Sequence, residues 1–480
     1  TSGSLACLMN RDGEVVRSAY QAHPPAYPQP GWVEQDPNEL WRVACNLLNR
    51  VMAEAGINAD EIAGIGLDNQ GESIVLWDRR TGEALSHVLV WQDTRTQDEV
   101  DALAANSDTA AEVRRRTGLR LDSYFSASKI RWLLDHAPAA PQHLAVGTLD
   151  SWLIWKLTEG RVFVTDGSTA ARTLLFNLHT LAWDDWLLHL FGIPTHVLPE
   201  IRESTGEFGC VTHSDLLCRG VPIVASLVDQ PAAMIGQGCL SAGQIKATYG
   251  TGCFINMNAG IHPVNSKHGL LTIVTWQRDG QTTYGLEGGV FTAGATLNWL
   301  SDHMGFVDDA RQIDDLCASD SGGALWIPAQ IGLSAPYWNR TIRGAWLGID
   351  LATTKAQLTR AVLEGIAARV AQIVNAMQDD AGLTIDALRV DGGLTNSSAL
   401  MQIQADLLGR PVEVLANAEA TAFGTCVLAA RAAGLWADDD LIRQQVRIDR
   451  TFMPSISEDQ RQAYLKRFDS AIRYLEGWYA

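Results

Sequence analysis

Short apolar segments alternate with amphipathic segments along the whole chain. The segments LACLM, IAGIGL, SIVLW, HVLVW and VPIVASLV are alternating or continuously apolar, which predicts strands of a partly or fully buried sheet. In SASKIRWLLDHA the apolar residues recur at spacings of three and four, which predicts a helix. Strands and helices that alternate in this way indicate an α/β protein.

The second half of the chain repeats this organisation. Strands are predicted in IKATYG, CFINMN and ALRV, and a long helix is predicted from Lys355 to about Asp379. A small-residue loop followed by a strand and a turn occurs in both TSGSLACLMNRDG and TYGTGCFINMNAG, as a duplicated lobe would produce. Because a single core stops growing at roughly 250 to 300 residues, we expect two large lobes. The segment GQGCLSAG is the expected hinge, and it divides the chain into residues 1–238 and 239–480.

The composition is typical of a soluble globular protein, with 46% hydrophobic and 19% charged residues. No segment approaches the ~18 consecutive apolar residues of a membrane span, and the N-terminus lacks the features of a signal peptide. The net charge of -18 argues against a nucleic-acid partner, which would require a basic surface. The eight cysteines are scattered without CxxC or Cys/His spacing. We therefore expect reduced thiols in a cytoplasmic protein, and neither a disulfide framework nor a zinc site.

Four loops rich in Gly, Thr and Ser are candidates for phosphate binding. The chain has no GxxxxGK[ST] loop, no GxGxxG before a helix and no HRD or DFG element, so a phosphotransferase would have to use other loops. Glycine lets backbone N–H groups approach an anion, and hydroxyls add donors, although each loop alone is also compatible with a tight turn. The loops are residues 1–3 (TSG), 248–252 (TYGTG), 293–296 (AGAT) and 391–393 (DGG).

The segment LVDQPAA ends a predicted buried strand on a carboxylate, Asp229. Ligands of open α/β sheets bind beyond the carboxyl ends of the strands, so this side chain is placed to reach a cleft. Pro231 suits the first turn of a following helix. Three roles for Asp229 are compatible with the pattern: a helix N-cap, a magnesium-associated carboxylate and a general base.

Ordered motifs along essentially the whole chain resemble those of the FGGY carbohydrate kinases. YFSASKIRWLLDH and RGAWLGI with the following QLTRAVLEGIA match the two diagnostic patterns of that family nearly position by position. The other matching segments are YPQPGWVEQDPNELW, VWQDTRT, GTLDSWLIWKLT, LVDQPAA, TYGTGCF, GLSAPYW and LRVDGG. Within the family, the glycerol-kinase branch is the most similar.

The resemblance implies two actin-like, ribonuclease-H-like lobes, each a mixed sheet flanked by helices, with the active site in the cleft between them. It implies ATP-dependent phosphorylation of a primary hydroxyl of a small polyol, with glycerol as the expected acceptor and sn-glycerol 3-phosphate as the product. The first lobe would bind the acceptor and the second most of the nucleotide. Mg²⁺ would accompany ATP with few direct protein ligands. A homodimer or homotetramer is expected.

The same resemblance implies roles for individual residues. Asp229 would be the general base that accepts the proton of the attacking hydroxyl. Glu72, Tyr124 and Gln230 would hold the acceptor hydroxyls, because each hydroxyl needs a partner when water is excluded. The other acceptor positions are Gly71 and two apolar walls, Trp91 and Phe254, which are also compatible with ordinary core aromatics. The predicted nucleotide-binding residues are Thr1, Ser2, Thr251, Gly252, Gly294, Asn298, Gly392, Gly393 and Asn396.

Three features depart from the pattern of the glycerol-kinase branch. The family opens with Asp-x-Gly-Thr, and Thr1 corresponds to that Thr, so we expect an aspartate and a strand ahead of Thr1 in the longer protein. Leu5 stands where glycerol kinases have Arg, and TSGS resembles the pentulose-kinase branch. HSDLLCRGVP replaces the Gly-Gly-Lys-Gly-Gly loop that binds fructose 1,6-bisphosphate in some bacterial members. We therefore expect no inhibition by that compound.

A fourth departure concerns the acceptor. The chain reads NQGES at residues 69–73, where glycerol kinases read Asn-Gln-Arg-Glu-Thr with an Arg that contacts glycerol. Gly71 would remove that donor and open space for a larger acceptor. A kinase for a tetritol or for a ketose of the xylulose or ribulose type is therefore the alternative enzyme, and Asp93 in WQDTRT also matches the WxDxR pattern of the sugar-kinase branches. A non-catalytic actin-fold sugar sensor is the alternative outside enzymes.

Overall fold

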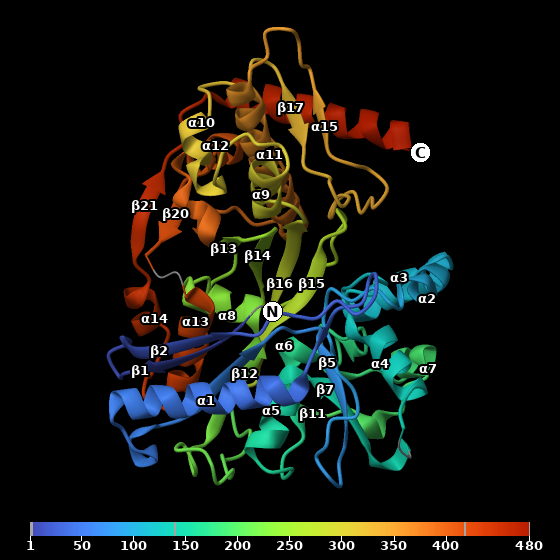
Figure 1. Ribbon diagram of the computed structural model, residues 1–480, viewed down its shortest axis with the longest axis vertical. Helices are drawn as coiled ribbons and strands as arrows, with labels where there is room; N and C mark the ends of the chain where they lie inside the picture. Colours follow the sequence, from blue (N-terminus) through green and yellow to red (C-terminus); the bar gives the residue numbers. More distant parts are fainter. Residues whose placement is uncertain (1–2, 139–140, 417–418, 480) are drawn as a thin grey trace.

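The computed structural model describes residues 3–138, 141–416 and 419–479 and has two parts stacked along its long axis (Figure 1). Most elements from the first half of the chain form the lower part, and most of those after residue 240 form the upper part. The chain folds into parallel and antiparallel strands covered by helices, so the predicted α/β class is confirmed.

The lower part contains a four-stranded sheet and several strand pairs. In spatial order, the sheet consists of β3 (Glu34–Gln35), β6 (Val88–Leu89), β5 (Ile74–Asp78) and β7 (Leu144–Thr148). The pairs are β1 (Gly3–Met9) with β2 (Val15–Ala22), β4 (Ile65–Asn69) with β12 (Ile223–Val228), β8 (Val164–Asp166) with β11 (Glu200–Arg202), and β9 (Phe176–Asn177) with β10 (Ala182–Trp183). The β4–β12 pair is parallel, and this arrangement positions the site described below.

The helices of the lower part follow the amphipathic segments of the sequence. The helix predicted in SASKIRWLLDHA is present as α4, and its apolar face is buried with Ile130 and Leu133. In chain order the helices are α1 (Pro37–Ala55), α2 (Gln97–Ala104), α3 (Ser107–Thr117), α4 (Ser126–Asp135), α5 (Leu149–Leu157), α6 (Gly167–Ala170), α7 (Asp185–Phe191) and α8 (Asp229–Gly236).

The upper part is built on a seven-stranded mixed sheet. In spatial order its strands are β15 (Leu271–Arg278), β16 (Gln281–Val290), β14 (Cys253–Gly260), β13 (Ile245–Tyr249), β19 (Leu388–Asp391), β20 (Val412–Leu415) and β21 (Ile448–Phe452). β13 is antiparallel to β14 and parallel to β19. β15 and β16 reach down to the lower part (Figure 1), where the Thr272 N–H donates to the Gly118 carbonyl at 3.0 Å.

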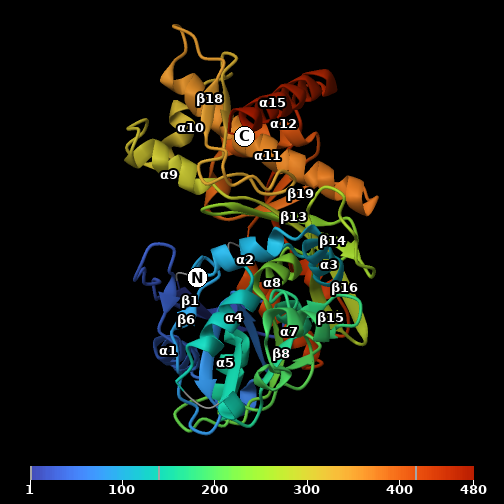
Figure 2. The same cartoon turned by 90° about the vertical axis from the view of Figure 1, so that its right-hand side faces the viewer.

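Helices of the upper part lie above this sheet in Figure 2. They are α9 (Gly294–Asp302), α10 (Ile313–Leu316), α11 (Lys355–Ala381), α12 (Ser398–Leu408) and α15 (Glu458–Tyr479), and a short pair of strands, β17 (Leu325–Ile327) and β18 (Ala345–Leu347), accompanies them. The predicted long helix is α11. Thr354 and Gln357 form a capping box at its start, and Gly382, with φ 64°, ends it.

Two helices from near the end of the chain, α13 (Ala420–Ala432) and α14 (Asp440–Gln445), lie beside the first half of the chain. α13 crosses α8 and also contacts β4, β12 and β1. Two glycines make the crossing close: a Cβ at Gly236 would lie 1.9 Å from the Ala420 carbonyl oxygen, and one at Gly424 would lie 1.9 Å from that of Ala232. The α8–α13 crossing therefore joins the two halves of the chain backbone to backbone.

Candidate active site

Two parallel strands bring the predicted base and the predicted acceptor segment together. In the β4–β12 pair, Asp68 lies opposite Leu227 and Asn69 opposite Val228. Both strands therefore end at the same edge, and the residues that follow them, 70–72 and 229–230, meet there.

A cavity of about 160 Å³ lies at this edge. All the residues predicted to bind the acceptor line it: Gly71, Glu72, Trp91, Tyr124, Asp229, Gln230 and Phe254. Two charged residues that sequence reasoning missed, Arg172 and Glu287, line it as well. The wall thus combines carboxylates, a guanidinium, an amide and aromatic rings, which is a suitable lining for a small molecule rich in hydroxyl groups.

Asp229 is the first residue of α8, and it does not serve as the N-cap. The N-cap is Val228, and the Asp229 carboxylate accepts a hydrogen bond from the adjacent Gln230 N–H at 2.7 Å. The capping role that the pattern left open is therefore not observed. Burial, and secondly the charge of Asp68, raise the pKa of the Asp229 carboxyl, while Lys246 acts in the opposite direction.

Lys246 is a fully buried cation behind Gln230. Its Nζ donates to Gln230 Oε1, which fixes that amide beside the cavity, and to Thr248 Oγ1 at 3.1 Å. Burial lowers the pKa of Lys246, although the carboxylates of Asp391 and Asp229 oppose that effect. Sequence reasoning missed this residue; the available signal was a lysine inside the predicted strand IKATYG.

Glu72, Arg172 and Glu287 form a buried charge network along one wall of the cavity. Arg172 Nε donates to Glu72 Oε1 at 2.6 Å, and Arg172 Nη2 donates to Glu287 Oε1 at 2.8 Å. Glu287 Oε2 in turn accepts from Asn256 Nδ2 at 3.1 Å. Since Glu287 and Asn256 belong to the upper sheet, the network joins the two parts of the molecule. A signal in the sequence was a charged residue within each of the apolar segments STAARTLLF and YGLEGGV.

Gly71 does not open additional space, so that expectation is wrong. A Cβ at this position would lie 2.3 Å from Val228 Cγ2 and 3.0 Å from Arg172 Cγ. The volume beside Gly71 is therefore already filled by Val228 and by the aliphatic part of Arg172.

Trp91 and Phe254, the two residues predicted to be aromatic walls, both line the cavity. Trp91 follows β6 and Tyr124 precedes α4, and their rings meet edge to face with centroids 5.4 Å apart. Phe254 comes from β14 and lines the same cavity. Asp93 lies outside this lining: it pairs with Arg95, and its Oδ2 accepts from the Val33 N–H at 2.7 Å. Asp93 therefore supports the loop that carries Trp91.

The predicted nucleotide-binding loops lie together at one edge of the upper sheet. β13 and β19 are parallel, so the loops after Tyr249 and Asp391 leave the sheet at the same edge. The β13–β14 turn packs on the start of α9, where the N–H groups of Ala293 and Ala295 donate to the Thr251 carbonyl at 2.9 and 3.0 Å. Gly392 has φ 93°, and a Cβ there would lie 2.4 Å from the Tyr249 carbonyl oxygen, so this close approach requires glycine.

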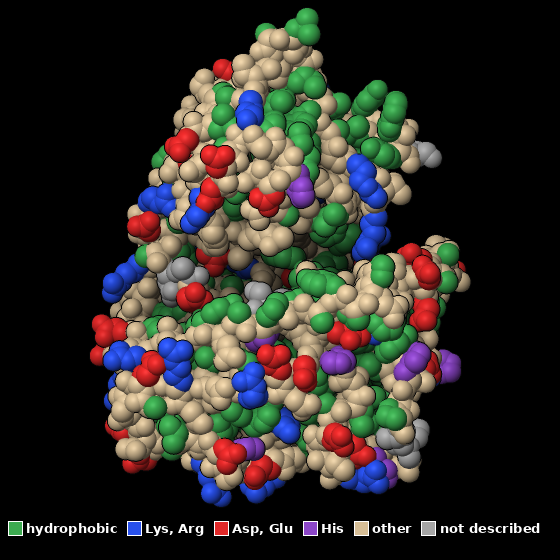
Figure 3. Space-filling view, in the orientation of Figure 1, with side chains coloured by type: hydrophobic (Ala, Val, Ile, Leu, Met, Phe, Trp, Pro, Cys, Tyr) green, Lys and Arg blue, Asp and Glu red, His purple; other side chains and the backbone are tan. Residues whose placement is uncertain are grey.

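Apart from Gly392, the predicted nucleotide residues fall into three groups. Gly252 and Gly294 lie at close backbone contacts: a Cβ at Gly294 would lie 2.6 Å from the Gly250 carbonyl oxygen, and one at Gly252 would lie 2.7 Å from that of Val290. Thr251, Asn298, Gly393 and Asn396 are exposed. Thr1 and Ser2 lie outside the described residues. Figure 3 shows the surface hollowed between the lower and upper parts on this face.

Comparison with known proteins identifies the family. The model of the FGGY family of carbohydrate kinases matches with its N-terminal domain at residues 1–236 and with its C-terminal domain at residues 245–433. The chain belongs to the FGGY family of carbohydrate kinases. It is 45% identical to the glycerol kinase of Dechloromonas aromatica (strain RCB) over 485 aligned positions, covering 100% of this chain and 96% of that relative. As a member of this family, the protein is an ATP-dependent carbohydrate kinase.

Solved structures of FGGY kinases share the fold. The crystal structure of Plasmodium falciparum glycerol kinase with ADP matches with a TM-score of 0.93 and 31% identity, covering 99% of this chain and 96% of that one. A ligand-bound xylulose kinase from Lactobacillus acidophilus matches with a TM-score of 0.90 at 22% identity, covering 100% and 97%. The predicted fold of two actin-like lobes, with mixed sheets flanked by helices, is confirmed.

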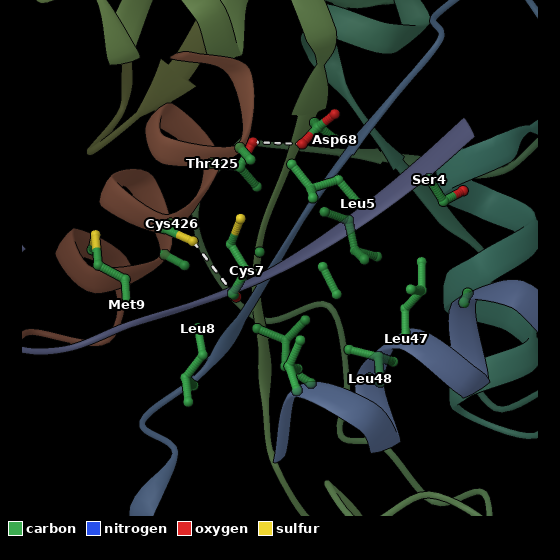
Figure 4. Close-up of a pocket in the computed structure, with 18 of the residues that line it drawn as sticks. Ser4, Leu5, Cys7, Leu8, Met9, Leu47, Leu48, Asp68, Thr425 and Cys426 are labelled. Carbon is green, nitrogen blue, oxygen red and sulfur yellow. Dashed lines mark hydrogen bonds between the residues drawn. The ribbon is translucent and has the colours of Figure 1, made fainter. Parts of the chain in front are cut away.

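This FGGY kinase contains a second, larger cavity of about 910 Å³ between β1 and β4 (Figure 4). Apolar side chains such as Leu5, Leu8 and Leu47 line it, together with Asp68, whose Oδ2 accepts from Thr425 Oγ1 at 2.8 Å. In the described part of the chain, β1 pairs only with β2 and β4 only with β12.

Asp229 lines both cavities, which explains why its carboxyl is enclosed by the protein and yet accessible to a small molecule.

Within residues 3–138, 141–416 and 419–479, no three or more His, Cys, Asp or Glu side chains are grouped so that they could hold a metal ion. In the same residues, no helix combines the length and apolar character needed to cross a membrane. All eight cysteines are free thiols.

Proposed function

We propose that this kinase transfers the γ-phosphoryl group of ATP to a primary hydroxyl of glycerol and releases sn-glycerol 3-phosphate and ADP. The observation that carries the proposal is the cavity of about 160 Å³ at Asp229. Its lining offers carboxylate, amide and hydroxyl partners for the hydroxyls of a small polyol, and aromatic rings that can cover a short carbon chain. The 45% identity to a glycerol kinase over the full chain supports the same acceptor.

Asp229 is the proposed general base. Its carboxylate accepts the proton of the acceptor hydroxyl while that oxygen bonds to the γ-phosphorus and the bond from phosphorus to the ADP oxygen breaks. The raised pKa of Asp229 increases its basicity, and the cation of Lys246 opposes that shift and favours the ionised carboxylate. Lys246 also holds Gln230, whose amide orients the acceptor.

The acceptor would be held by hydrogen bonds on one wall and by aromatic rings on the other. Glu72 and Tyr124 hydrogen-bond the hydroxyls that are not phosphorylated, and Gly71 contributes its backbone. Trp91 and Phe254 cover the carbon chain. Exclusion of water from this volume makes each unmatched hydroxyl costly, which gives selectivity for a polyol of the right length.

The nucleotide would bind across the loops of the upper part. We assign residues 1–238 to an acceptor lobe and 239–480 to a nucleotide lobe. The nucleotide positions are Thr1, Ser2, Thr251, Gly252, Gly294, Asn298, Gly392, Gly393 and Asn396. The glycine loops and the Thr251 hydroxyl would supply donors for phosphate oxygens. Mg²⁺ would be bound chiefly by the phosphates and by water.

The setting of the enzyme is also proposed. A cytoplasmic location fits the eight free cysteines, because thiols persist in reducing compartments. A homodimer or homotetramer is the proposed assembly, and the mass of the protein in solution measured by light scattering tests it.

Asp229→Asn tests the role of the base. The amide keeps the shape of the side chain but cannot accept the proton, so kcat should fall by roughly 100- to 10,000-fold in a coupled assay of ADP release. Asp215→Asn, in an exposed loop, is the matched control and should retain the wild-type kcat. A variant Asp229→Asn that keeps most of its phosphotransfer rate would show that another group is the base.

An acceptor panel tests the substrate. Wild-type protein should show its highest kcat/KM with glycerol among glycerol, erythritol, xylulose and ribulose. A four- or five-carbon acceptor that is used far better than glycerol would overturn the proposed acceptor. Binding of a polyol without any phosphotransfer would instead favour the sugar-sensor alternative.

A further inference from the structure

Arg172 is a cation in the lining of the acceptor cavity. It follows the short helix α6 and is only 3% exposed. Its Nε and Nη2 groups are bound by Glu72 and Glu287, and Nη2 also lies 3.5 Å from the Tyr124 hydroxyl. Arg172 is therefore held rigidly by three side chains that themselves line the cavity.

One nitrogen of this guanidinium has no hydrogen-bond partner. Arg172 Nη1 is buried, and nothing in the described part of the chain accepts its N–H groups. A buried donor on a charged group is costly to leave unmatched, so such groups are normally paired by protein, water or ligand. Arg172 is one of the residues that line the acceptor cavity, and a ligand in that cavity could supply the missing acceptor atom.

The backbone beside Arg172 explains why the guanidinium can occupy this position. A Cβ at residue 71 would lie 3.0 Å from Arg172 Cγ and 2.3 Å from Val228 Cγ2, so any side chain at that position would have to displace them. Glycine at residue 71 removes the competing side chain. Arg172 then supplies to the cavity the cationic donor that the NQGES segment lacks.

We propose that Arg172 determines acceptor specificity by donating a hydrogen bond from Nη1 to a hydroxyl oxygen of the polyol that is not phosphorylated. This inference rests on the proposed function. Glu72 and Glu287 fix the plane of the guanidinium, so the remaining donor is preorganised and acts only on an acceptor atom at the correct place. A methylene at that place leaves the charged N–H unmatched, and such an analogue is rejected.

The test compares glycerol with propane-1,2-diol and propane-1,3-diol in wild-type and Arg172→Lys proteins. Lysine keeps the charge that Glu72 and Glu287 require but lacks the fork that presents Nη1. The variant should lose about 10- to 100-fold in kcat/KM on glycerol, as expected for a hydrogen bond to a charged group. It should lose at most about 3-fold on the diol that lacks the contacted hydroxyl, which leaves glycerol with a smaller advantage.

Arg369→Lys is the matched control. Arg369 is 1% exposed, also has a nitrogen without a partner, and lies on α11 outside the cavity lining. Its replacement should lower the melting temperature without changing the ratio of kcat/KM values among the three acceptors. An equal loss on all three acceptors in Arg172→Lys would reduce Arg172 to a structural role and overturn the proposal.

A structure of the wild-type protein with glycerol gives an answer that does not depend on whether the variant folds. Arg172 Nη1 should lie about 2.7–3.2 Å from a glycerol oxygen other than the one next to Asp229. Glycerol bound out of reach of Nη1 overturns the proposal. Wild-type protein that does not phosphorylate glycerol overturns the proposed acceptor instead, so the two failures are distinguishable.

Discussion

The charges around the acceptor cavity are arranged so that one carboxylate remains available. Glu72 and Glu287 are both paired with Arg172 at hydrogen-bond distance. Asp229, among the described residues, has no cation within ion-pair distance and accepts only a backbone N–H in the observed hydrogen bonds. Pairing stabilises the first two carboxylates as structural anions, since a buried unpaired charge is costly. Of these three carboxylates, Asp229 is the one without an ion-pair partner among the described residues, and it can therefore accept a proton.

The pH dependence of activity follows from the environment of Asp229. Burial and the nearby Asp68 raise its pKa above the ordinary value of 3.8, and a protonated carboxyl cannot act as a base. We therefore expect kcat/KM to fall as the pH falls through this raised pKa, at a higher pH than an ordinary aspartate would cause. A profile of kcat/KM against pH measures it, and a rate that stays level down to pH ~4 would contradict it.

Lys246→Met gives a second test of the pH dependence assigned to Asp229. Removal of the cation that lowers the pKa of Asp229 should move the acid limb of the profile to higher pH, and Gln230 loses its partner, so KM for glycerol should rise. Lys156→Met is the control, because Lys156 lies over the Trp41 and Trp152 rings, away from the cavity. It should leave the position of the limb unchanged.

Individual site residues differed in how far the sequence could predict them. Asp229, Glu72 and Tyr124 belong to motifs of the family, so the resemblance placed them together and the structure finds all three at one cavity. Arg172 and Glu287 lie 115 positions apart, and their contact depends on how β16 meets the lower part. Neither local pattern nor motif carries that information. The same reason explains why Gly71 was wrongly expected to open space.

At the level of elements, the α8–α13 crossing holds the two halves of the chain together beside Asp229, the first residue of α8. Gly424→Ala should disrupt it, since the new Cβ would lie 1.9 Å from the Ala232 carbonyl oxygen and neither helix backbone can yield cheaply. Overpacking of this kind costs about 1–3 kcal/mol. We expect a lower melting temperature and, because α8 begins with Asp229, a reduced kcat.

Gly477→Ala is the matched control for this prediction. Gly477 is an exposed helical glycine of α15, and no atom lies within 4 Å of an added Cβ. Alanine has the higher helix propensity, so the control should be neutral or stabilising by up to about 1 kcal/mol. Equal melting temperatures for Gly424→Ala and wild type would show that the two helices can separate without cost.

Most helices and strands could be predicted from the spacing of apolar residues along the chain. The elements that each of them packs against could not. The predicted helix from Lys355 to about Asp379 ends at Ala381, and the strand before Asp229 ends at Val228. HVLVW yields only the two-residue strand β6, because the chain turns at Val90 to place Trp91 at the cavity. The packing of α13 against β1 and β4 joins residues more than 350 positions apart, and no local pattern indicates such a contact.

On the scale of the whole molecule, one hairpin serves both proposed binding sites. β13 and β14 carry Lys246 and Phe254 at the acceptor cavity, and the turn between them carries Thr251 and Gly252 at the nucleotide loops. The network of Glu72, Arg172 and Glu287 also joins the lower part to β16 of the upper sheet. Ligands on the two sides therefore share the same connecting elements.

We predict that acceptor and nucleotide bind with positive coupling. A ligand that fixes the β13–β14 hairpin from one side reduces the ordering left for the other, so saturating glycerol should lower the Kd of a non-hydrolysable ATP analogue by about 5-fold or more. Titration calorimetry measures both orders of addition, and thermodynamic linkage requires the same factor in each. Arg172→Lys loosens the connection between the two parts and should reduce that factor, whereas Arg369→Lys should preserve it. Equal affinities with and without glycerol would mean that the hairpin is already rigid and that the two sites act independently.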